Sequence, residues 1–498
     1  MRELILALVL ASSCATSEPR PSGIYFVMVD RFENGDRSND GDANPEDPQA
    51  FHGGDLQGVI NRLDWIQSLG FDTVWLSPIF KMRVEKWHGY GAFHGYWTWD
   101  LSKIEPRFGD ESTLSRLREA LAKRGMKLLL DLVLNHVGPD APLQKEHPDW
   151  FHNRGGITDW NDPQQLVLND VHGLPDLATE KPEVFAYLSE SAKKWHADGF
   201  RLDAVKHLPL DFWSKFNAGK GESLGELLDG NPDTIANTWK DGGFTSMFDF
   251  PLGFAIADVF CRGAPPSKLA ATLTNDRRYP DPLALVTLVD NHDLPRLMSV
   301  CGNDVGKVKN ALTFLIAMRG TPSIIWGTEV GLDGDKEPDN RKSMRFDEKN
   351  ELRAHVTKQM QQRAASAPLR EGGVAVVDVG PNHLELMRMT KNGDATTVRI
   401  QNGVVTITPA NKVFPDVYEQ WRTGAKKKAV RFEGEGFVVG SGPELGDWNK
   451  DKAVPLPATI ELPINGVFEF KRLTPTREWA PGENNVLHVE AEGELITL

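Results

Sequence analysis

The sequence lacks any hydrophobic run that is long enough to cross a membrane. The apolar stretch near its N-terminus, Leu4–Ala11, is far shorter than the roughly 20 residues of a transmembrane helix. Cysteine is scarce as well, with three residues in a chain of 498. After Cys14, only Cys261 and Cys301 remain, and they can form one disulfide in an oxidising compartment or stay two buried thiols.

Basic residues are also under-represented relative to acidic ones. The chain has 56 Lys and Arg against 70 Asp and Glu, which gives a net charge of −14. Nucleic acids and anionic membranes are bound through basic patches, so this balance argues against either as the main partner. A neutral ligand is compatible with it, and we expect a monomer.

The first residues predict an export signal. Arg2, the apolar run and the small residues that follow it are typical of a secretory leader, here residues 1–21. Cys14 follows Ala-Ser-Ser and resembles the acylated cysteine of bacterial lipoproteins. We therefore expect a periplasmic or outer-surface lipoprotein that touches a membrane only through a lipid on Cys14. Simple cleavage and secretion is the alternative, and a start site assigned too early is a third possibility.

Strand-like apolar runs recur along the first 330 residues, with helical patterns between most of them. The runs cover residues 23–30, 71–78, 127–136, 199–205, 223–228, 244–250, 283–293 and 322–330. Between the first two runs, Leu56, Val59, Ile60 and Leu63 have the 3,4 spacing of an amphipathic helix. Apolar strands that alternate with helices indicate a parallel sheet covered on both faces, and eight such units predict a (β/α)8 barrel.

Polar residues gather at the C-terminal ends of these predicted strands. They are Asn135 and His136 on the third strand, Asp203 on the fourth, Glu226 on the fifth, and His292 and Asp293 on the seventh. The C-terminal rim of a (β/α)8 barrel carries its active site. This one-sided distribution therefore predicts an enzyme.

The stretch GFRLDAVKH, residues 199–207, places Arg201 and Asp203 on the same side of one strand. A neighbouring guanidinium favours the ionised form of a buried carboxyl group, which is the form that a nucleophile needs. A structural ion pair would explain this strand if it stood alone. Glu226 and Asp293 point to the same rim, however, and two carboxyl groups flanking a glycosidic bond are the minimum for glycoside hydrolysis.

Seven motifs resemble those of the α-amylase family, glycoside hydrolase family 13, in the same order. The four signature regions are DLVLNH (131–136), GFRLDAVKH (199–207), LGELLDG (224–230) and VDNHD (289–293). Three further blocks are AFHGYWTWD (92–100), GLPDLAT (173–179) and GTPSIIWGTEVG (320–331). The resemblance spans about residues 22–425.

The resemblance implies a role for each matching residue. Asp203 would be the nucleophile, Glu226 the protonated acid/base, and Asp293 the carboxylate that grips sugar hydroxyls. Tyr96, His136, Arg201 and His292 would line the subsite of the attacked sugar, Arg341 would contact the next sugar, and Lys206 and His207 would reach the sugar on the leaving side. The reaction would be retaining, with its two main carboxyl groups about 5–5.5 Å apart.

The resemblance also implies calcium. The family ties an inserted domain B, here about residues 137–180, to the barrel with a calcium ion, and the matching ligands are Asn135, Asp176 and the backbone carbonyl of His207. A second cluster resembles the calcium loop of cyclodextrin glucanotransferases, with Asn34, Asp36, Asn39, Asp40, Gly53 and Asp55 in the matching positions. Oxygen ligands suit this hard cation. A solvated acidic turn is the alternative for the second cluster.

The last quarter of the chain predicts two β-rich domains after a catalytic barrel of residues 22–368. Residues 369–425 resemble the family's domain C. Residues 426–498 resemble the β-sandwich starch-binding domain of carbohydrate-binding module family 20. Trp448, Lys471, Trp479 and Asn484 match its first binding site, and we expect the two indoles to form an exposed platform remote from the barrel opening. Core packing is the alternative for both tryptophans.

The resulting expectation is an endo-acting α-amylase that cleaves starch, glycogen or maltooligosaccharides. A cyclodextrin glucanotransferase or maltogenic-type transglycosylase is the alternative. Those transferases carry a central aromatic residue where this chain has His172, and a phenylalanine where it has Leu228. Water should therefore compete better with an acceptor sugar here. A glucan-binding protein without catalysis is a further alternative, against which the three carboxyl groups argue.

Overall fold

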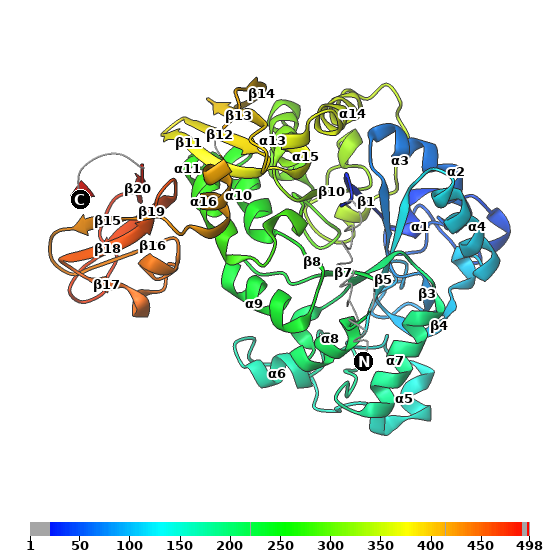
Figure 1. Ribbon diagram of the computed structural model, residues 1–498. Helices are drawn as coiled ribbons and strands as arrows, with labels where there is room; N and C mark the ends of the chain where they lie inside the picture. The colour runs from blue at the N-terminus through cyan, green and yellow to red at the C-terminus, as the bar shows by residue number, and fades with distance from the viewer. Residues whose placement is uncertain (1–19, 220, 414, 491–495, 498) are drawn as a thin grey trace, which may run out of the picture.

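The computed structural model describes residues 20–219, 221–413, 415–490 and 496–497. Its centre is a parallel sheet of eight strands in the order β8-β7-β6-β5-β2-β1-β10-β9, with helices around it (Figure 1). These strands are β1 (Ile24–Val27), β2 (Thr73–Leu76), β5 (Lys127–Leu132), β6 (Gly199–Leu202), β7 (Glu222–Gly225), β8 (Ser246–Met247), β9 (Val286–Thr287) and β10 (Thr321–Ile325). A parallel bridge between Phe248 and Val286 links the two edges, so the sheet is nearly closed. The predicted (β/α)8 barrel is confirmed.

Several barrel strands are shorter than their hydrophobic runs predict. The run 283–293 predicts one long strand, whereas β9 covers only Val286–Thr287. Leu288 and Val289 come directly after β9 and are buried although strand pairing has ended. Loops cover the rim of the barrel, so hydrophobic residues continue where the strand has stopped. The fifth and sixth predicted strands are shortened in the same way.

Helices connect the strands and cover the outside of the barrel. They are α2 (Leu56–Asn61), α3 (Leu63–Leu69), α4 (Glu111–Ala122), α7 (Pro182–Lys194), α8 (Leu210–Asn217), α9 (Pro232–Gly242), α10 (Phe250–Phe260), α11 (Ser267–Thr274), α12 (Leu297–Val300), α13 (Val305–Ala317), α14 (Glu351–Ala364) and α15 (Ala367–Glu371). The single helix predicted after Asp55 is divided into α2 and α3, because Arg62 leaves the helical conformation. None of the helices in the described part of the chain is long and apolar enough to span a membrane.

The segment between β5 and α7 forms an irregular insertion beside the barrel opening. Its helical parts are α5 (Pro142–Glu146), a short 3-10 turn at Pro148–Trp150, and α6 (Pro163–Leu168). Backbone hydrogen bonds attach its two ends to each other: the Leu177 N–H donates to the Asn135 carbonyl at 2.9 Å, and the Val137 N–H donates to the Pro175 carbonyl at 3.1 Å. An antiparallel hairpin of β3 (Phe80–Met82) and β4 (Thr98–Ile104) lies earlier in the chain.

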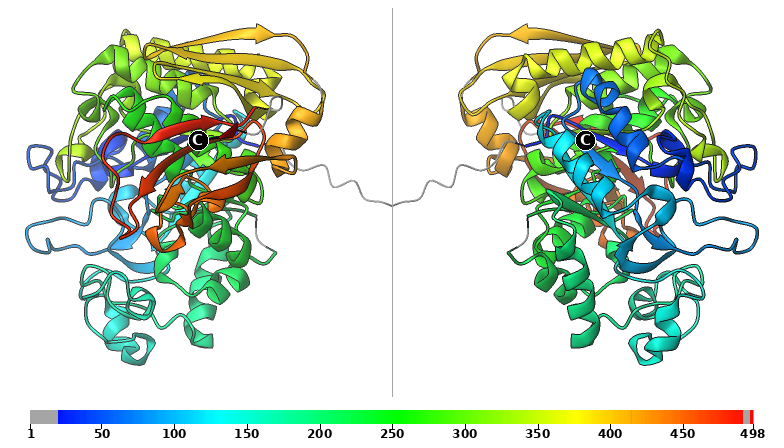
Figure 2. Two further views of the ribbon diagram at one scale, coloured as in Figure 1. Left: turned by 90° about the vertical axis from the view of Figure 1, so that its left-hand side faces the viewer. Right: turned by 90° about the vertical axis from the view of Figure 1, so that its right-hand side faces the viewer.

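Three further sheets follow the barrel in the chain. The first is an antiparallel meander of β11 (Gly373–Gly380), β12 (His383–Met389), β13 (Ala395–Gln401) and β14 (Val404–Ala410). After α16 (Pro415–Thr423), the last two sheets consist of β15 (Lys427–Phe432), β16 (Phe437–Gly440), β17 (Val454–Pro455), β18 (Ala458–Pro463), β19 (Val467–Leu473), β20 (Asn485–His488) and β21 (Ile496–Thr497). We call this last unit the C-terminal lobe. Figure 2 shows it in orange and red against one side of the barrel.

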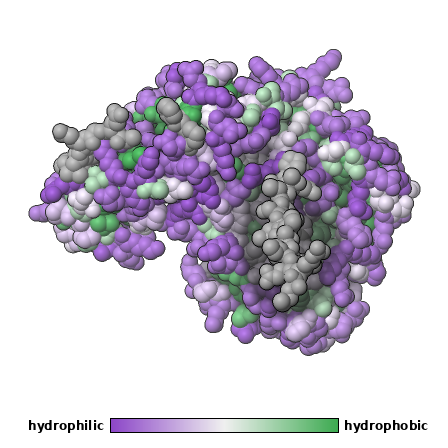
Figure 3. Space-filling view, viewed as in Figure 1, coloured by the Kyte–Doolittle hydropathy of each residue, from purple (hydrophilic) through white to green (hydrophobic). Residues whose placement is uncertain are grey.

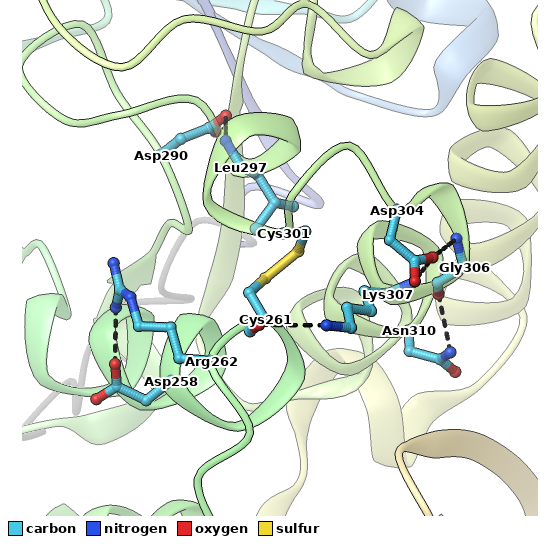
Figure 4. The surroundings of a disulfide bond; sticks show 10 residues. All are labelled: Asp258, Cys261, Arg262, Asp290, Leu297, Cys301, Asp304, Gly306, Lys307 and Asn310. Carbon is cyan, nitrogen blue, oxygen red and sulfur yellow. Dashed lines mark hydrogen bonds and ion pairs between the residues drawn. A yellow bond between two sulfur atoms is a disulfide. The ribbon is translucent and has the colours of Figure 1, made fainter.

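A disulfide joins Cys261 and Cys301, which the sequence leaves open as a pair or as two thiols. Cys261 ends α10 and Cys301 ends α12, and the two residues are 40 positions apart in the chain (Figure 4). Both are buried in the barrel wall. The Lys307 ammonium group lies 3.5 Å from the Cys261 carbonyl, so α13 contacts the bridge as well.

Candidate active site

A cavity of about 700 Å³ opens at the carboxyl ends of the barrel strands. Nearly all of the predicted catalytic and sugar-contacting residues line it: Asp203, Glu226, Asp293, Tyr96, His136, Lys206, His207, His292 and Arg341. The exception is Arg201, which is fully buried beneath the cavity floor. The structure therefore brings together residues that are spread over 246 positions of the sequence, from Tyr96 to Arg341.

Arg201 is the centre of the charged network under this floor. Its Nη1 donates to Asp203 Oδ1 at 2.5 Å, and its Nη2 lies 3.8 Å from Glu226 Oε2. The same Nη1 also donates to both oxygens of Asp131, at 2.9 and 3.1 Å. One buried guanidinium thus holds the two main carboxyl groups of the cavity and a third carboxyl group below them.

Asp131 is the residue of this network that the sequence interpretation missed. It lies on β5, beneath the cavity, and its Oδ2 also accepts hydrogen bonds from the Tyr96 hydroxyl at 2.9 Å and from Trp75 Nε1 at 3.1 Å. Burial raises the pKa of Asp131 to about 7, although the Arg201 guanidinium opposes this rise. The sequence signal that could have identified Asp131 is a charged residue within an apolar strand. Asp131 orients Arg201 and Tyr96 and does not line the cavity.

Glu226 follows β7 and differs electrostatically from Asp203. Burial raises the pKa of Glu226 to about 7; the charges of Asp203 and Asp293 add to this rise, and Arg201 opposes it. Its Oε2 accepts a hydrogen bond from the Ala204 N–H at 3.1 Å. Near neutral pH a substantial fraction of Glu226 therefore carries a proton that it can donate. Asp203 instead makes a short charge-assisted hydrogen bond with Arg201.

Asp293 is held by two further residues that line the cavity. Arg341 Nη2 lies 3.1 Å from Asp293 Oδ1, and His292 Nε2 lies 3.2 Å from Asp293 Oδ2. Burial favours the neutral acid, yet His292 and Arg341 outweigh it and hold the pKa of Asp293 below its usual value. Burial also lowers the pKa of His292 to about 3, so His292 is a neutral imidazole at pH 7. Its ring stacks on Tyr96, with ring centroids 4.8 Å apart.

Trp160 is a second residue that the sequence interpretation missed. Its side chain comes from the insertion, is 47% exposed and lines the cavity. Its ring centroid lies 5.4 Å from that of His172 and 6.1 Å from that of His207. An aromatic ring therefore stands beside His172, although position 172 itself is not aromatic. No motif surrounds Trp160, so only the high number of tryptophans, 14 in the chain, hinted at such a residue.

The first predicted calcium site does not fit the ion in this structure. Asn135 and Asp176 lie together at the junction of the insertion and the barrel, but His152 Nδ1 is 2.5 Å from Asp176 Oδ2. His152 Nε2 lies 3.1 Å from Glu180 Oε2 on its other side. Calcium requires a shell of oxygen ligands, whereas here an imidazole bridges the two carboxyl groups. The third predicted ligand is the backbone carbonyl of His207, and the imidazole Nδ1 of the same residue lies 2.8 Å from the Leu166 carbonyl.

The second predicted calcium site fits the ion better. The amide oxygens of Asn34 and Asn39 are buried and have no hydrogen-bond partner in the described part of the chain. A Cβ added to Gly53, where φ is +90°, would meet Asn34 Nδ2 at 2.7 Å and Asp40 Oδ1 at 3.1 Å. The loop thus forms a small cradle beside Gly53 that is lined by the Asn34 amide group and the Asp40 carboxyl group. Asp55 Oδ2 accepts from Asn39 Nδ2 at 3.2 Å, whereas Asp36 is exposed and bonds to Ser38.

Within the described residues, no three His, Cys, Asp or Glu side chains cluster in a way that could hold a metal ion.

The four predicted starch-binding residues lie in the C-terminal lobe. The Trp448 and Trp479 rings have centroids 6.3 Å apart, and Trp479 is 43% exposed, which excludes a core position for it. Lys471 Nζ donates to the Gly482 carbonyl at 2.6 Å, and Asn484 is exposed nearby. Trp448 differs from expectation, because it is half-buried and faces a cleft whose other wall is the barrel. Trp448 therefore lies beside the outer helices of the barrel.

Comparisons with known proteins show which proteins this chain resembles. The model of the alpha-amylase catalytic domain matches residues 26–237 and 265–372. That match ends before the C-terminal lobe, and starch binding by this lobe stays a prediction.

Among curated relatives, a cyclomaltodextrinase of a Bacillus species is 32% identical over 426 residues, with 76% of this chain and 72% of the relative covered. The beta/alpha-amylase of Paenibacillus polymyxa is 32% identical over 76% of this chain, but the chain spans only 33% of that protein. The crystal structure of an alpha-amylase from Geobacillus thermoleovorans, complexed with acarbose, is 31% identical and superposes with a TM-score of 0.71, over 90% of this chain and 96% of that one. This chain is therefore a member of the alpha-amylase family, glycoside hydrolase family 13, and a glycosidase.

Proposed function

We propose that the protein hydrolyses internal α-1,4-glucosidic bonds of starch-like glucans with retention of anomeric configuration. The observation that carries this proposal is the unequal pair on Arg201: Asp203 is ion-paired, whereas burial raises the pKa of Glu226 to about 7. Asp203 attacks the anomeric carbon, and Glu226 gives its proton to the departing glycosidic oxygen. Glu226 then takes a proton from water, which attacks the anomeric carbon and releases Asp203.

The remaining residues of the cavity bind the sugar in this scheme. Asp293, held by Arg341 and His292, accepts hydrogen bonds from sugar hydroxyls, while neutral His292 and His136 can donate them. Tyr96 presents a ring to the face of the attacked sugar. Lys206 and His207 lie on the side of Glu226 and contact the leaving sugar.

Transglycosylation is the second candidate activity, and Trp160 is the observation that favours it. An acceptor sugar competes with water only where the protein holds it, and aromatic rings stack on sugar faces. Trp160 supplies such a ring beside His172, on the side where Lys206 and His207 line the cavity. Starch, glycogen and maltooligosaccharides are the proposed substrates of either reaction.

We expect the protein to release linear maltooligosaccharides from soluble amylose, with the new reducing ends first formed as α-anomers. Proton NMR during the first minutes of digestion measures this, and β-anomers as first products would contradict retention. Trp160→Ala should lower the share of transfer products roughly fivefold, because a stacked ring contributes about 1 kcal/mol. His172→Phe is the matched variant that should raise this share. Equal product ratios in all three proteins would show that Trp160 does not bind the acceptor.

We further propose that calcium binds the loop that contains Asn34 and Asn39. A ligand that binds only the folded state raises the thermal midpoint by mass action, so chelation should lower the midpoint by a few degrees. In Gly53→Ala, the added Cβ fills the cradle, and chelation should have no further effect. Gly125→Ala is the control: its φ of +67° gives similar backbone strain, but nothing lies within 4 Å of the added Cβ. If chelation does not change the thermal midpoint of the unaltered protein, the proposed site is wrong.

We also propose that the protein is exported, either as a lipoprotein or in secreted form. The disulfide between Cys261 and Cys301 supports an oxidising compartment. Cys14 and the rest of the predicted leader up to residue 19 lie outside the described residues, so a lipid on Cys14 and a monomeric state are proposals that rest on the sequence.

A further inference from the structure

A cleft of about 370 Å³ separates the C-terminal lobe from the barrel. Trp448 forms part of the lobe's wall, and the first residues of α9, together with Phe254 of α10 and Thr272 of α11, form the barrel's wall. The molecular outline is hollowed between the lobe and the barrel in Figure 3. The cleft is lined by apolar side chains such as Trp448 and Phe254 and by polar ones such as Asn231 and Thr272, a combination that suits the apolar face and the hydroxyl groups of a sugar.

Ion pairs fix the two walls of this cleft relative to each other. Arg278 Nη1 and Nη2 donate to the two oxygens of Asp447, at 2.8 and 2.9 Å. Arg277 Nη2 lies 2.8 Å from Glu444 Oε2. Both arginines are largely buried, and fork-shaped contacts of this kind define orientation as well as distance. Because Asp447 is the neighbour of Trp448 in the chain, this contact also fixes the position of the indole opposite the barrel.

The cleft adjoins the active-site cavity. Leu228, which is 46% exposed, lines the cavity, and Gly230 lines the cleft. Two residues of extended chain span at most about 7 Å, so the two rims lie close together. The N-terminal ends of α9 and α10 also lie at the face where the strands end, because each helix follows its strand directly.

We propose that this cleft is an additional subsite for the α-glucan segment that leaves the active-site cavity past Leu228. The proposal rests on the proposed function. Leu228 follows Glu226 by two positions, and Glu226 protonates the leaving oxygen, so the sugars on this side belong to the leaving part of the chain. Trp448 stacks on a sugar of that segment. A long substrate therefore gains a contact that a trisaccharide is too short to reach.

The test compares maltotriose with a maltodecaose-length chain, using the complete protein and kcat/KM for each. The ratio of the long-chain value to the short-chain value should fall roughly fivefold in Trp448→Ala, in line with about 1 kcal/mol for a stacked ring. Thr272→Trp should cause the same loss from the opposite wall, because it fills the cleft and keeps Trp448. Val486→Ala is the control and should keep the ratio, since Val486 is 45% exposed on the same lobe and does not line the cleft. Thermal midpoints verify that each variant is folded.

An unchanged ratio in both cleft variants would overturn the subsite. So would an equal loss on both chain lengths, because it would show that Trp448 acts through the stability of the lobe. If the unaltered protein cleaves neither chain, the proposed function fails and the subsite fails with it. If it cleaves both chains, and the ratio is the same in the unaltered protein, Trp448→Ala and Thr272→Trp, only the subsite fails.

Discussion

Glu226→Gln is expected to lower kcat/KM on maltooligosaccharides by roughly 10³-fold or more, and Asp203→Asn by at least as much. The amide cannot donate a proton in the first case and cannot form a glycosyl-enzyme in the second. Initial rates with a purified maltooligosaccharide measure both losses. Asp241→Asn is the matched control, because it removes an exposed carboxyl group of α9 that does not line the cavity and should keep the activity.

A substrate whose leaving group needs no proton distinguishes the role of Glu226 as acid from that of Asp203 as nucleophile. The fluoride ion leaves maltosyl fluoride without needing a proton. Glu226→Gln should therefore still form the glycosyl-enzyme from this substrate, whereas Asp203→Asn should not. Mass spectrometry of the trapped protein detects the adduct. An adduct on Asp203→Asn, or a tenth of the normal rate in either variant on ordinary substrates, would refute the assigned role.

The pH profile gives a further readout of Glu226. A general acid works only while it is protonated, and burial raises the pKa of Glu226 to about 7. In the unaltered protein kcat/KM should therefore fall as the pH rises through about 7. This alkaline decline should be absent when Glu226→Gln acts on the fluoride.

Arg201→Met is expected to destabilise the protein by about 3–5 kcal/mol and to abolish activity. Removing one member of a buried ionic network leaves the other uncompensated, and here both Asp131 and Asp203 would lose the guanidinium. Urea unfolding at neutral pH measures the free-energy change. The double variant Arg201→Met, Asp131→Asn should regain part of the stability, because the amide removes the unpaired buried charge, yet it should remain inactive.

Arg201→Lys is the control that keeps the charge and loses the second terminal nitrogen, Nη2, which lies 3.8 Å from Glu226 Oε2. We expect intermediate stability and a large loss of activity, because one ammonium cannot hold Asp131, Asp203 and Glu226 together. A fully stable Arg201→Met single variant would contradict the assignment of Arg201 as the centre of the network.

The barrel could be predicted because its strand and helix periods alternate cleanly, and the cavity because its residues come from motifs at the strand ends. The strand ends themselves could not be predicted, since Leu288 and Val289 are as buried outside β9 as a strand residue would be. Trp160 could not be placed either, because its position depends on contacts with His172 and His207 and on no regular element.

The surroundings of the first predicted calcium site could not be predicted for a similar reason. The matching ligands Asn135 and Asp176 are present, but the sequence gives no sign that His152 folds back onto Asp176 from 24 positions earlier. Asp131 was visible in its motif and was not weighed, because a carboxyl group that acts through Arg201 has the same sequence signature as any buried polar residue.

The bridge between Cys261 and Cys301 changes the unfolded chain more than the folded one. It closes a loop of 40 residues that includes β9, His292 and Asp293. In the chain-entropy description, closing a loop of that length lowers the conformational entropy of the denatured ensemble and thereby raises its free energy by about 4 kcal/mol. Synthesis in a reducing compartment would therefore leave the contacts of the cavity as they are and lower the free energy of unfolding. The wall that carries Asp293 would then depend on noncovalent contacts alone, so the compartment in which the chain folds becomes a determinant of the stability of its active site.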